Sequence, residues 1–312
     1  MALTRVDGAL TQAPTQAGHG RWAGRLAGNK GRRRGRDQRP AVVPTVILLL
    51  GAVYCLLPVV WVLTASTKNN AQLFNTFTFA PSGSLWSNIR GLSDYAGGVF
   101  WHWMLNTALY AGGGALLSVV VSALTGYALA KFEFRGRSTL FNLLLAGVLV
   151  PPVVLALPQY LLLAKVGLTN SYWSVLLPSI LSPYGIYLAR IYAMSAVPDE
   201  VIESARVDGC PEGTLFARIA VPMMTPGLVT IFLFQFVAVW NNFLLPFIML
   251  SDENKFPLTV GLFTLLNRGS SAPSLYSLVV TGSLLSIIPL IILFLALQRY
   301  WRTDIASGAV KQ

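Results

Sequence analysis

The sequence has few charged residues, and this shortage excludes most soluble classes of protein. Only 11% of its 312 residues are Asp, Glu, Lys or Arg, whereas a soluble domain carries about 25%. Apolar residues make up 54% of the chain. This composition predicts an integral membrane protein, for which membrane spans are counted in place of soluble domains.

Cysteine and histidine are also scarce. Two cysteines, Cys55 in an apolar run and Cys210 in a charged segment, are too few for a disulfide framework. With His19 and His102 as the only histidines, the sequence offers no Cys/His cluster for zinc or for histidine-based catalysis. A phosphate-binding Gly-x-x-x-x-Gly-Lys-Ser/Thr loop is missing too. We therefore expect a chain that is not an enzyme and holds no cofactor or metal of its own.

Long apolar runs predict an all-α membrane protein with six transmembrane helices. Each run approaches the roughly 20 residues that a membrane-spanning helix needs, and none contains an acidic residue. The predicted spans are residues 42–63, 103–129, 140–163, 172–188, 228–250 and 275–297.

Basic residues predict the orientation of these spans. With the N-terminus inside, 18 of the 23 Lys and Arg fall on the inner side and five on the outer side. The positive-inside rule then places both termini in the cytoplasm, as expected for a multi-pass membrane protein.

The predicted domain organisation is a basic tail followed by one membrane domain. Residues 1–40 carry nine Lys and Arg, and a segment this polar cannot bury a core, so we expect it to be disordered. Its arginine run lies just before the first span, where topology control and attraction to anionic membrane lipid explain it better than nucleic acid does. Residues 41–312 form the membrane domain, and the first apolar run is too long for a cleaved signal peptide.

A charged segment interrupts the apolar chain between the fourth and fifth spans. Five of the 12 acidic residues fall within positions 199–212. We call residues 194–225 the acidic loop. Asp199 and Glu200 suit the first turn of a short helix, and Gly209 suits its left-handed end. Pro211 and Glu212 can start a second helix, which we expect Pro222 to end. Val201, Ile202 and Ala205 are predicted to share the apolar side of the first helix.

The acidic loop resembles the Glu-Ala-Ala loop of ABC importer permeases of the carbohydrate-uptake branch. The match comprises Glu203-Ser204-Ala205, Asp208-Gly209, Ile219 and Pro222, with Ser204 and Cys210 as departures. In that family the loop is a coupling helix that seats in a cytoplasmic ATPase subunit. The resemblance assigns this ATPase-coupling role to Glu200, Glu203, Ser204, Ala205, Arg206, Asp208 and Gly209. The alternative reading from the residues alone is an ordinary interfacial helix that links two spans.

Further stretches resemble the same family in the same order along the chain, from about residue 40 to the end. They are Gly126–Arg137 at the inner end of the second span, Trp240-Asn241-Asn242-Phe243 with Pro246, and Gln298-Arg299-Tyr300-Trp301 near the end, where Gln312 replaces a usual final glycine. The resemblance implies a type I importer permease that works with a second homologous permease, an ATPase dimer and an extracytoplasmic solute-binding protein. ATP and magnesium would then belong to the ATPase partners.

Polar side chains within the spans are candidates for the substrate pathway. They are Gln159, Tyr160, Tyr184, Gln235, Trp240, Asn241 and Asn242. Gln235 and Asn242 are seven residues apart, which predicts one helix face. Amides and aromatic rings suit a sugar, and they equally suit packing between helices. The competing function is a stand-alone secondary transporter or channel, although the spans lack a clearly buried ionisable residue to bind a driving ion.

Overall fold

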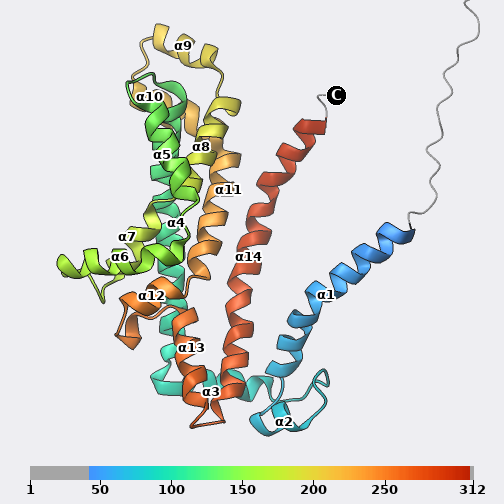
Figure 1. The fold of residues 1–312 in the computed structure, drawn as a ribbon. Coiled ribbons are helices and arrows are strands. Elements are labelled where there is room, and N and C mark those ends of the chain that lie inside the picture. Colours follow the sequence, from blue (N-terminus) through green and yellow to red (C-terminus); the bar gives the residue numbers. More distant parts are fainter. Residues whose placement is uncertain (1–41, 310–312) are drawn as a thin grey trace, which may run out of the picture. The chain divides into compact units, whose positions relative to one another are not determined.

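The computed structural model describes residues 42–309, with side chains described as far as residue 300 (Figure 1). Every regular element in this range is a helix, as predicted. The described residues divide between two units, with the boundary between residues 53 and 54, and the packing discussed below lies within the second unit. The predicted basic tail, residues 1–40, falls outside the described residues.

Five helical segments are long and apolar enough to cross a membrane, or six if one bent pair counts as a span. They are α1 (Val42–Ser66), α4 (Val99–Lys131), α7 and α8 together (Tyr172–Ala196), the helix from Glu212 to Trp240, and α14 (Leu275–Ala309). Each overlaps one predicted span.

The third predicted span is not one straight helix. It consists of α5 (Arg137–Val148) and α6 (Pro152–Lys165), which meet at an angle of 106°. Pro151 precedes α6 with an extended backbone, φ −60° and ψ 129°, and Pro152 begins it. A proline disfavours helical geometry in the residue before it and donates no backbone hydrogen bond, so two in succession end α5 and restart the chain in a new direction.

Two predictions about the fifth span are wrong. Pro222 does not end a helix, because α10 (Glu212–Leu215) continues through a π-helical turn, η2 (Phe216–Ala220), into α11 (Val221–Trp240). Such a turn widens the hydrogen-bond ladder and accommodates a residue without an N–H group. The helix instead ends at Trp240, before α12 (Leu244–Met249), so Gln235 and Asn242 do not share a helix face.

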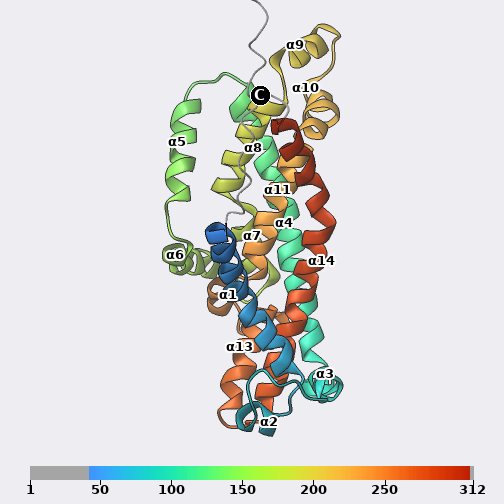
Figure 2. The ribbon, with the colours of Figure 1, turned by 90° about the vertical axis from the view of Figure 1, so that its right-hand side faces the viewer.

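Helices α4, α8 (Pro183–Ala196) and α11 pack side by side and form the centre of the second unit (Figures 1 and 2). A stripe of small buried residues runs along α4: Ala111, Gly114, Ala115, Ser118, Ser122, Ala123 and Gly126. Small side chains let helix backbones approach closely, which favours association where lipid gives no hydrophobic drive. Helices α4 and α8 approach closely at Gly126, where an added Cβ would stand 2.5 Å from the Cβ of Ala189 on α8.

The end of the helices opposite the acidic loop is closed by shorter elements. Helices α2 (Asn70–Asn75) and α3 (Leu85–Asp94) and the turn η1 (Tyr95–Gly97) connect α1 to α4. In the sequence, Trp86, Asn88 and Tyr95 suit either a docking loop or an interfacial one. Asn88 is buried, and its Nδ2 donates to the carbonyls of Ser66 and Lys68 at 2.9 and 2.8 Å, which is a structural role. Trp86 is 74% exposed.

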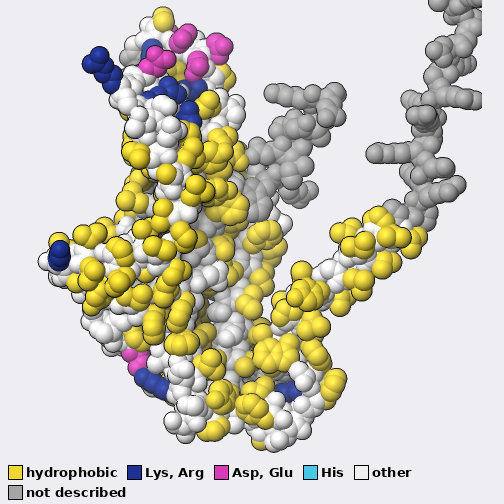
Figure 3. All heavy atoms as spheres, in the orientation of Figure 1, with side chains coloured by type: hydrophobic (Ala, Val, Ile, Leu, Met, Phe, Trp, Pro, Cys, Tyr) yellow, Lys and Arg dark blue, Asp and Glu magenta, His cyan; other side chains and the backbone are white. Residues whose placement is uncertain are grey.

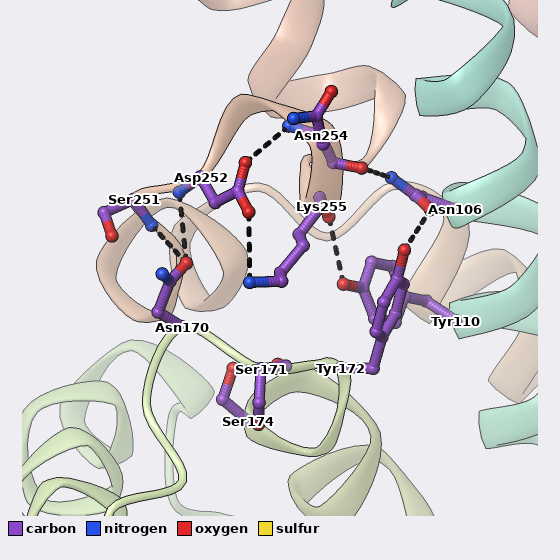
Figure 4. A network of polar contacts seen from close by, with 10 residues as sticks. All are labelled: Asn106, Tyr110, Asn170, Ser171, Tyr172, Ser174, Ser251, Asp252, Asn254 and Lys255. Carbon is purple, nitrogen blue, oxygen red and sulfur yellow. Dashed lines mark hydrogen bonds and ion pairs between the residues drawn. The ribbon is translucent and has the colours of Figure 1, made fainter.

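A polar network fastens the loop between α12 and α13 (Leu258–Gly269) to the helices (Figure 4). This loop contains the turn η3 (Glu253–Lys255). Asn106 on α4 donates from Nδ2 to the carbonyl of Asn254 at 2.7 Å and accepts from the Tyr172 hydroxyl at 3.1 Å. The Tyr110 hydroxyl donates to the carbonyl of Lys255 at 3.0 Å. The loop therefore depends on side chains of α4 and α7 (Tyr172–Ile180) for its conformation.

Replacing Asn106 by alanine is expected to loosen this loop and to lower the free energy of unfolding by about 2 kcal/mol, because partly buried backbone carbonyls lose their donor. Thermal unfolding in detergent and protease cleavage within residues 250–257 measure both effects. Asn267→Ala, at an exposed position on α13, is the matched control. Equal melting temperatures and equal cleavage of the two variants would contradict the proposed role of Asn106.

Candidate functional site

The acidic loop contains two helices, α9 and α10, which are joined by a turn at one end of the second unit. Helix α9 spans Asp199–Val207, with Asp199 and Glu200 in its first turn. It begins after Pro198, which has an extended backbone, φ −63° and ψ 145°. It ends as predicted, because Gly209 takes a φ of +78°, and the Cys210 N–H returns to the Ala205 carbonyl at 2.9 Å.

One side of α9 packs on the spans. Ile202 is 3% exposed and Ala205 is 9% exposed, and both join a cluster with residues of α4, α8, α10 and α11. The predicted apolar side is therefore correct for these two residues and wrong for Val201, which is 36% exposed. The prediction that Ala205 lies on the docking surface is therefore wrong. Its side chain packs against the spans and helps to anchor α9. The cluster fixes α9 to the inner part of the protein.

Two ion pairs hold α9 at its two ends. At its start, Lys131 Nζ lies 2.6 Å from Asp199 Oδ1 and also donates to the Val197 carbonyl at 2.6 Å. The Lys131 side chain is only 5% exposed, so this contact is shielded from water on one side. At its end, Arg206 Nε lies 2.6 Å from Glu212 Oε1. That hydrogen bond raises the pKa of Arg206 above its usual range, so the arginine stays charged at any physiological pH.

The opposite side of α9 is exposed and strongly charged. Figure 3 shows the acidic side chains gathered over α9 and the neighbouring turn, with Lys and Arg side chains directly below them. The exposed residues among those predicted for coupling are Glu200, Glu203, Ser204, Arg206, Asp208 and Gly209. Sequence reasoning missed Val207, which is 88% exposed at the tip of the helix. A single exposed apolar side chain is common on protein surfaces, so its place at the tip of α9, beside the predicted coupling residues, makes Val207 a candidate contact.

The candidate pathway residues are spread over α6, α8, α11 and the turn that follows α11. Gln235 Nε2 donates to the Ser179 carbonyl at 2.7 Å, and Trp240 is 4% exposed and stacks on Phe236 with ring centroids 5.4 Å apart. Gln235 therefore joins α11 to Ser179 at the end of α7. Trp240 is buried in a core cluster beside Phe236 of its own helix, so both side chains fit the packing alternative. Tyr184 differs, because 44% of it is exposed.

The remaining pathway candidates have mixed surroundings. Tyr160 packs partly against the core, and Gln159 beside it is half-buried. Asn241 is exposed, and Asn242 is half-buried with its carbonyl accepting from the Thr259 hydroxyl at 2.7 Å. The Asn241 amide donates to the Val237 carbonyl of α11 at 2.9 Å, so this turn also has a structural role at the end of the helix.

The described residues thus form a multi-span helical protein in which a short charged helix, α9, is anchored to α4, α8 and α11. Comparison with known proteins identifies the family. Residues 118–306 match the family described as "Binding-protein-dependent transport system inner membrane component". The chain belongs to this family, the permease subunits of ABC importers.

The relatives and a solved structure agree with this assignment. The chain is 34% identical to the arabinooligosaccharides transport system permease protein AraQ of Halalkalibacterium halodurans, over 83% of this chain and 92% of the relative. It is 30% identical to the lactose transport system permease protein LacG of Rhizobium radiobacter, over 85% and 94%. It also resembles a chain of a solved bacterial ABC transporter involved in the import of the acidic polysaccharide alginate, with a TM-score of 0.72 and 25% identity over 83% and 95% of the two chains.

Proposed function

We propose that this permease subunit imports a carbohydrate, and that its cargo is a neutral oligosaccharide. The relatives named for arabinooligosaccharides and lactose support the carbohydrate class. Other relatives are named for sn-glycerol-3-phosphate, and the solved transporter for an acidic polysaccharide. The candidate pathway residues of this chain are amides and aromatic rings without a charged group, which suits an uncharged cargo that binds by stacking and hydrogen bonds.

The proposed topology has six spans, with the bent pair α5 and α6 counted as the third. The excess of Lys and Arg on one side supports a cytoplasmic location for both termini and for the acidic loop. The protein would then lie in the bacterial plasma membrane with α9 at the cytoplasmic surface. The loop between α12 and α13 would lie outside, where the family's solute-binding protein delivers its cargo.

The proposed coupling mechanism is mechanical. Closure of an ATPase dimer, which would hold the ATP and magnesium, displaces α9, and α9 carries the spans attached to it. The proposal rests on one observation: one side of α9 is buried against the spans, and the other side is exposed. Its inner side is anchored by Ile202 and Ala205, while Glu203, Val207 and Asp208 face outward. A force applied to the outer side therefore reaches α4, α8 and α11 through packed side chains.

The proposed partners are a second homologous permease chain, an ATPase dimer, an extracytoplasmic solute-binding protein and membrane lipid, and no nucleic acid is expected. Purification in mild detergent, with this chain as bait, tests the assembly. We expect an ATPase subunit and a second permease to co-purify, and the ATPase to be lost from a Glu203→Lys/Val207→Ser variant that still inserts in the membrane. Recovery of this chain alone, with transport in vesicles that lack ATP, would favour the secondary transporter.

A further inference from the structure

We propose that a pocket beside the start of α5 binds the phosphate of an anionic phospholipid of the inner leaflet. The pocket has a volume of about 440 Å³ and lies between the turn that follows α4, the first turn of α5 and the side of α8. Its lining includes Arg137, Ser138 and Thr139 from α5, together with Arg190 from α8. Nothing in the coupling mechanism uses these side chains.

The two arginines are held in place by the end of α4. Arg137 donates from Nε to the Leu129 carbonyl at 2.8 Å and from Nη2 to the Ala130 carbonyl at 3.1 Å. Arg190 donates from Nε to the same Leu129 carbonyl at 3.3 Å, and its guanidinium lies 3.9 Å above the centre of the Phe141 ring. Both guanidinium groups therefore converge on one carbonyl and are oriented before any ligand arrives.

Donor groups remain for an anion in this pocket. The two terminal nitrogens of Arg190 have no hydrogen-bond partner among the residues that the structure describes. The guanidinium fork matches the oxygens of a phosphate in geometry and charge. The Ser138 and Thr139 hydroxyls line the same space, and the first turn of α5 has no side-chain cap, so its N–H groups favour an anion as well. Glu133 also lines the pocket, and its carboxylate would repel an anion. The positive charges of Arg137 and Arg190 outnumber this single negative charge.

The surroundings point to a lipid as the source of the phosphate. After Arg137, α5 exposes Leu140 at 43% and Leu143 at 66%. These two leucines are three residues apart, so they are neighbours on the helix surface and offer an apolar track for an acyl chain. The pocket sits where the apolar part of α4 ends at Lys131, which is headgroup depth. Basic pockets between transmembrane helices on the cytoplasmic side bind anionic headgroups in other membrane proteins. The location in the inner leaflet rests on the proposed orientation.

A bound phosphate would brace the coupling region. It would bind Arg137 on α5 and Arg190 on α8, which both donate to the carbonyl of Leu129. Leu129 lies two residues before Lys131, which pairs with Asp199 on α9. Anionic lipid is therefore expected to stiffen the contact between α4 and α9 and to increase the fraction of ATP hydrolysis that drives transport.

The test measures the lipid that stays bound to the protein and needs no transport activity. A negative result would therefore reject the lipid site without rejecting the proposed function. The transporter is purified with its partner subunits, reconstituted in nanodiscs of equimolar phosphatidylcholine and phosphatidylglycerol, re-extracted and analysed by native mass spectrometry. We expect selective retention of phosphatidylglycerol. Arg137→Gln and Arg190→Gln should each lower it about fivefold, as expected for one basic group near an anionic surface. Arg218→Gln, which removes an exposed charge outside the pocket, should leave it unchanged.

Two further variants separate ligand binding from folding. Glu133→Gln removes the opposing carboxylate and should increase retention, a gain that a damaged fold does not produce. Arg190→Lys keeps the charge without the planar fork and should give an intermediate value. Equal retention in the Arg137→Gln/Arg190→Gln double variant and the parent would overturn the proposal. So would equal retention of both lipids, displacement of the lipid by millimolar inorganic phosphate, or cross-links from position 190 to the ATPase instead of to lipid.

Discussion

Adding one methyl group at Gly126 should prevent α4 and α8 from packing, and the Gly126→Ala variant should be recovered poorly and melt at a much lower temperature. The new Cβ would stand 2.5 Å from the Cβ of Ala189 and 2.6 Å from the backbone nitrogen of Arg190. A backbone atom cannot rotate away as a long side chain can, so the two helices must separate. Overpacking of this kind costs roughly 1–3 kcal/mol and more where the backbone must move.

The control for this prediction lies on the same helix. Gly112 is also helical, and an added Cβ there meets nothing within 4 Å. Gly112→Ala should therefore be neutral or slightly stabilising, because alanine favours the helix by up to about 1 kcal/mol over glycine. The two variants are compared by thermal unfolding in detergent. Similar melting temperatures would mean that the close contact between α4 and α8 is not essential.

Changing the exposed side of α9 should abolish ATP-driven transport while leaving the protein folded. Glu203 and Val207 face away from the spans, and Val207 is 88% exposed, so Glu203→Lys with Val207→Ser removes no internal contact. Central interface residues commonly contribute 2 kcal/mol or more to binding, which predicts a loss of at least about tenfold in transport and in bound ATPase. Uptake into vesicles and co-purification of the ATPase measure the two losses.

The matched control replaces another exposed valine. Val166 is 65% exposed, in the turn after α6 and away from the acidic loop. Val166→Ser should leave uptake and ATPase binding near the parent values. If the α9 variant transported as well as Val166→Ser does, α9 would be an ordinary link between spans.

The sequence was sufficient to predict the helical fold because a bilayer leaves little choice. Backbone groups in lipid must bond within their own segment, so a long apolar run has to be a helix. Asp199, Glu200 and Gly209 likewise marked the ends of α9, since the helix dipole and the left-handed cap are local effects.

The errors arose where distant contacts decide the outcome. Pro222 reads as a helix end, but a π-helical turn absorbs it within a helix that packs on α4 and α8. Trp240 ends α11 directly before Asn241 and Asn242, and asparagine is itself a signal for a helix end; the apolar residues on both sides outweighed that signal in the prediction, which extended the helix to Asn242. Prolines 151 and 152 are a local signal for a break, but the predicted third span ran through them; the 106° angle between α5 and α6 depends on how each helix packs against its neighbours.

The candidate site was located by its motif, but the orientation of its side chains was not. Ala205 belongs to the family triplet and was assigned to the docking surface, whereas it packs inward. Val207 is apolar and was not selected, although it is 88% exposed at the tip of α9. The ion pair between Lys131 and Asp199 joins positions 68 residues apart, a contact that no local pattern can reveal.

The most direct test of the central claim is uptake of a radiolabelled neutral oligosaccharide into vesicles that contain the purified transporter and its solute-binding protein. We predict uptake only when ATP is available to the ATPase on the vesicle face that exposes α9. Uptake should fall at least about tenfold in the Glu203→Lys/Val207→Ser variant, while the variant melts at the parent temperature. Uptake by this chain without ATP or an ATPase, at the same rate in parent and variant, would contradict the account.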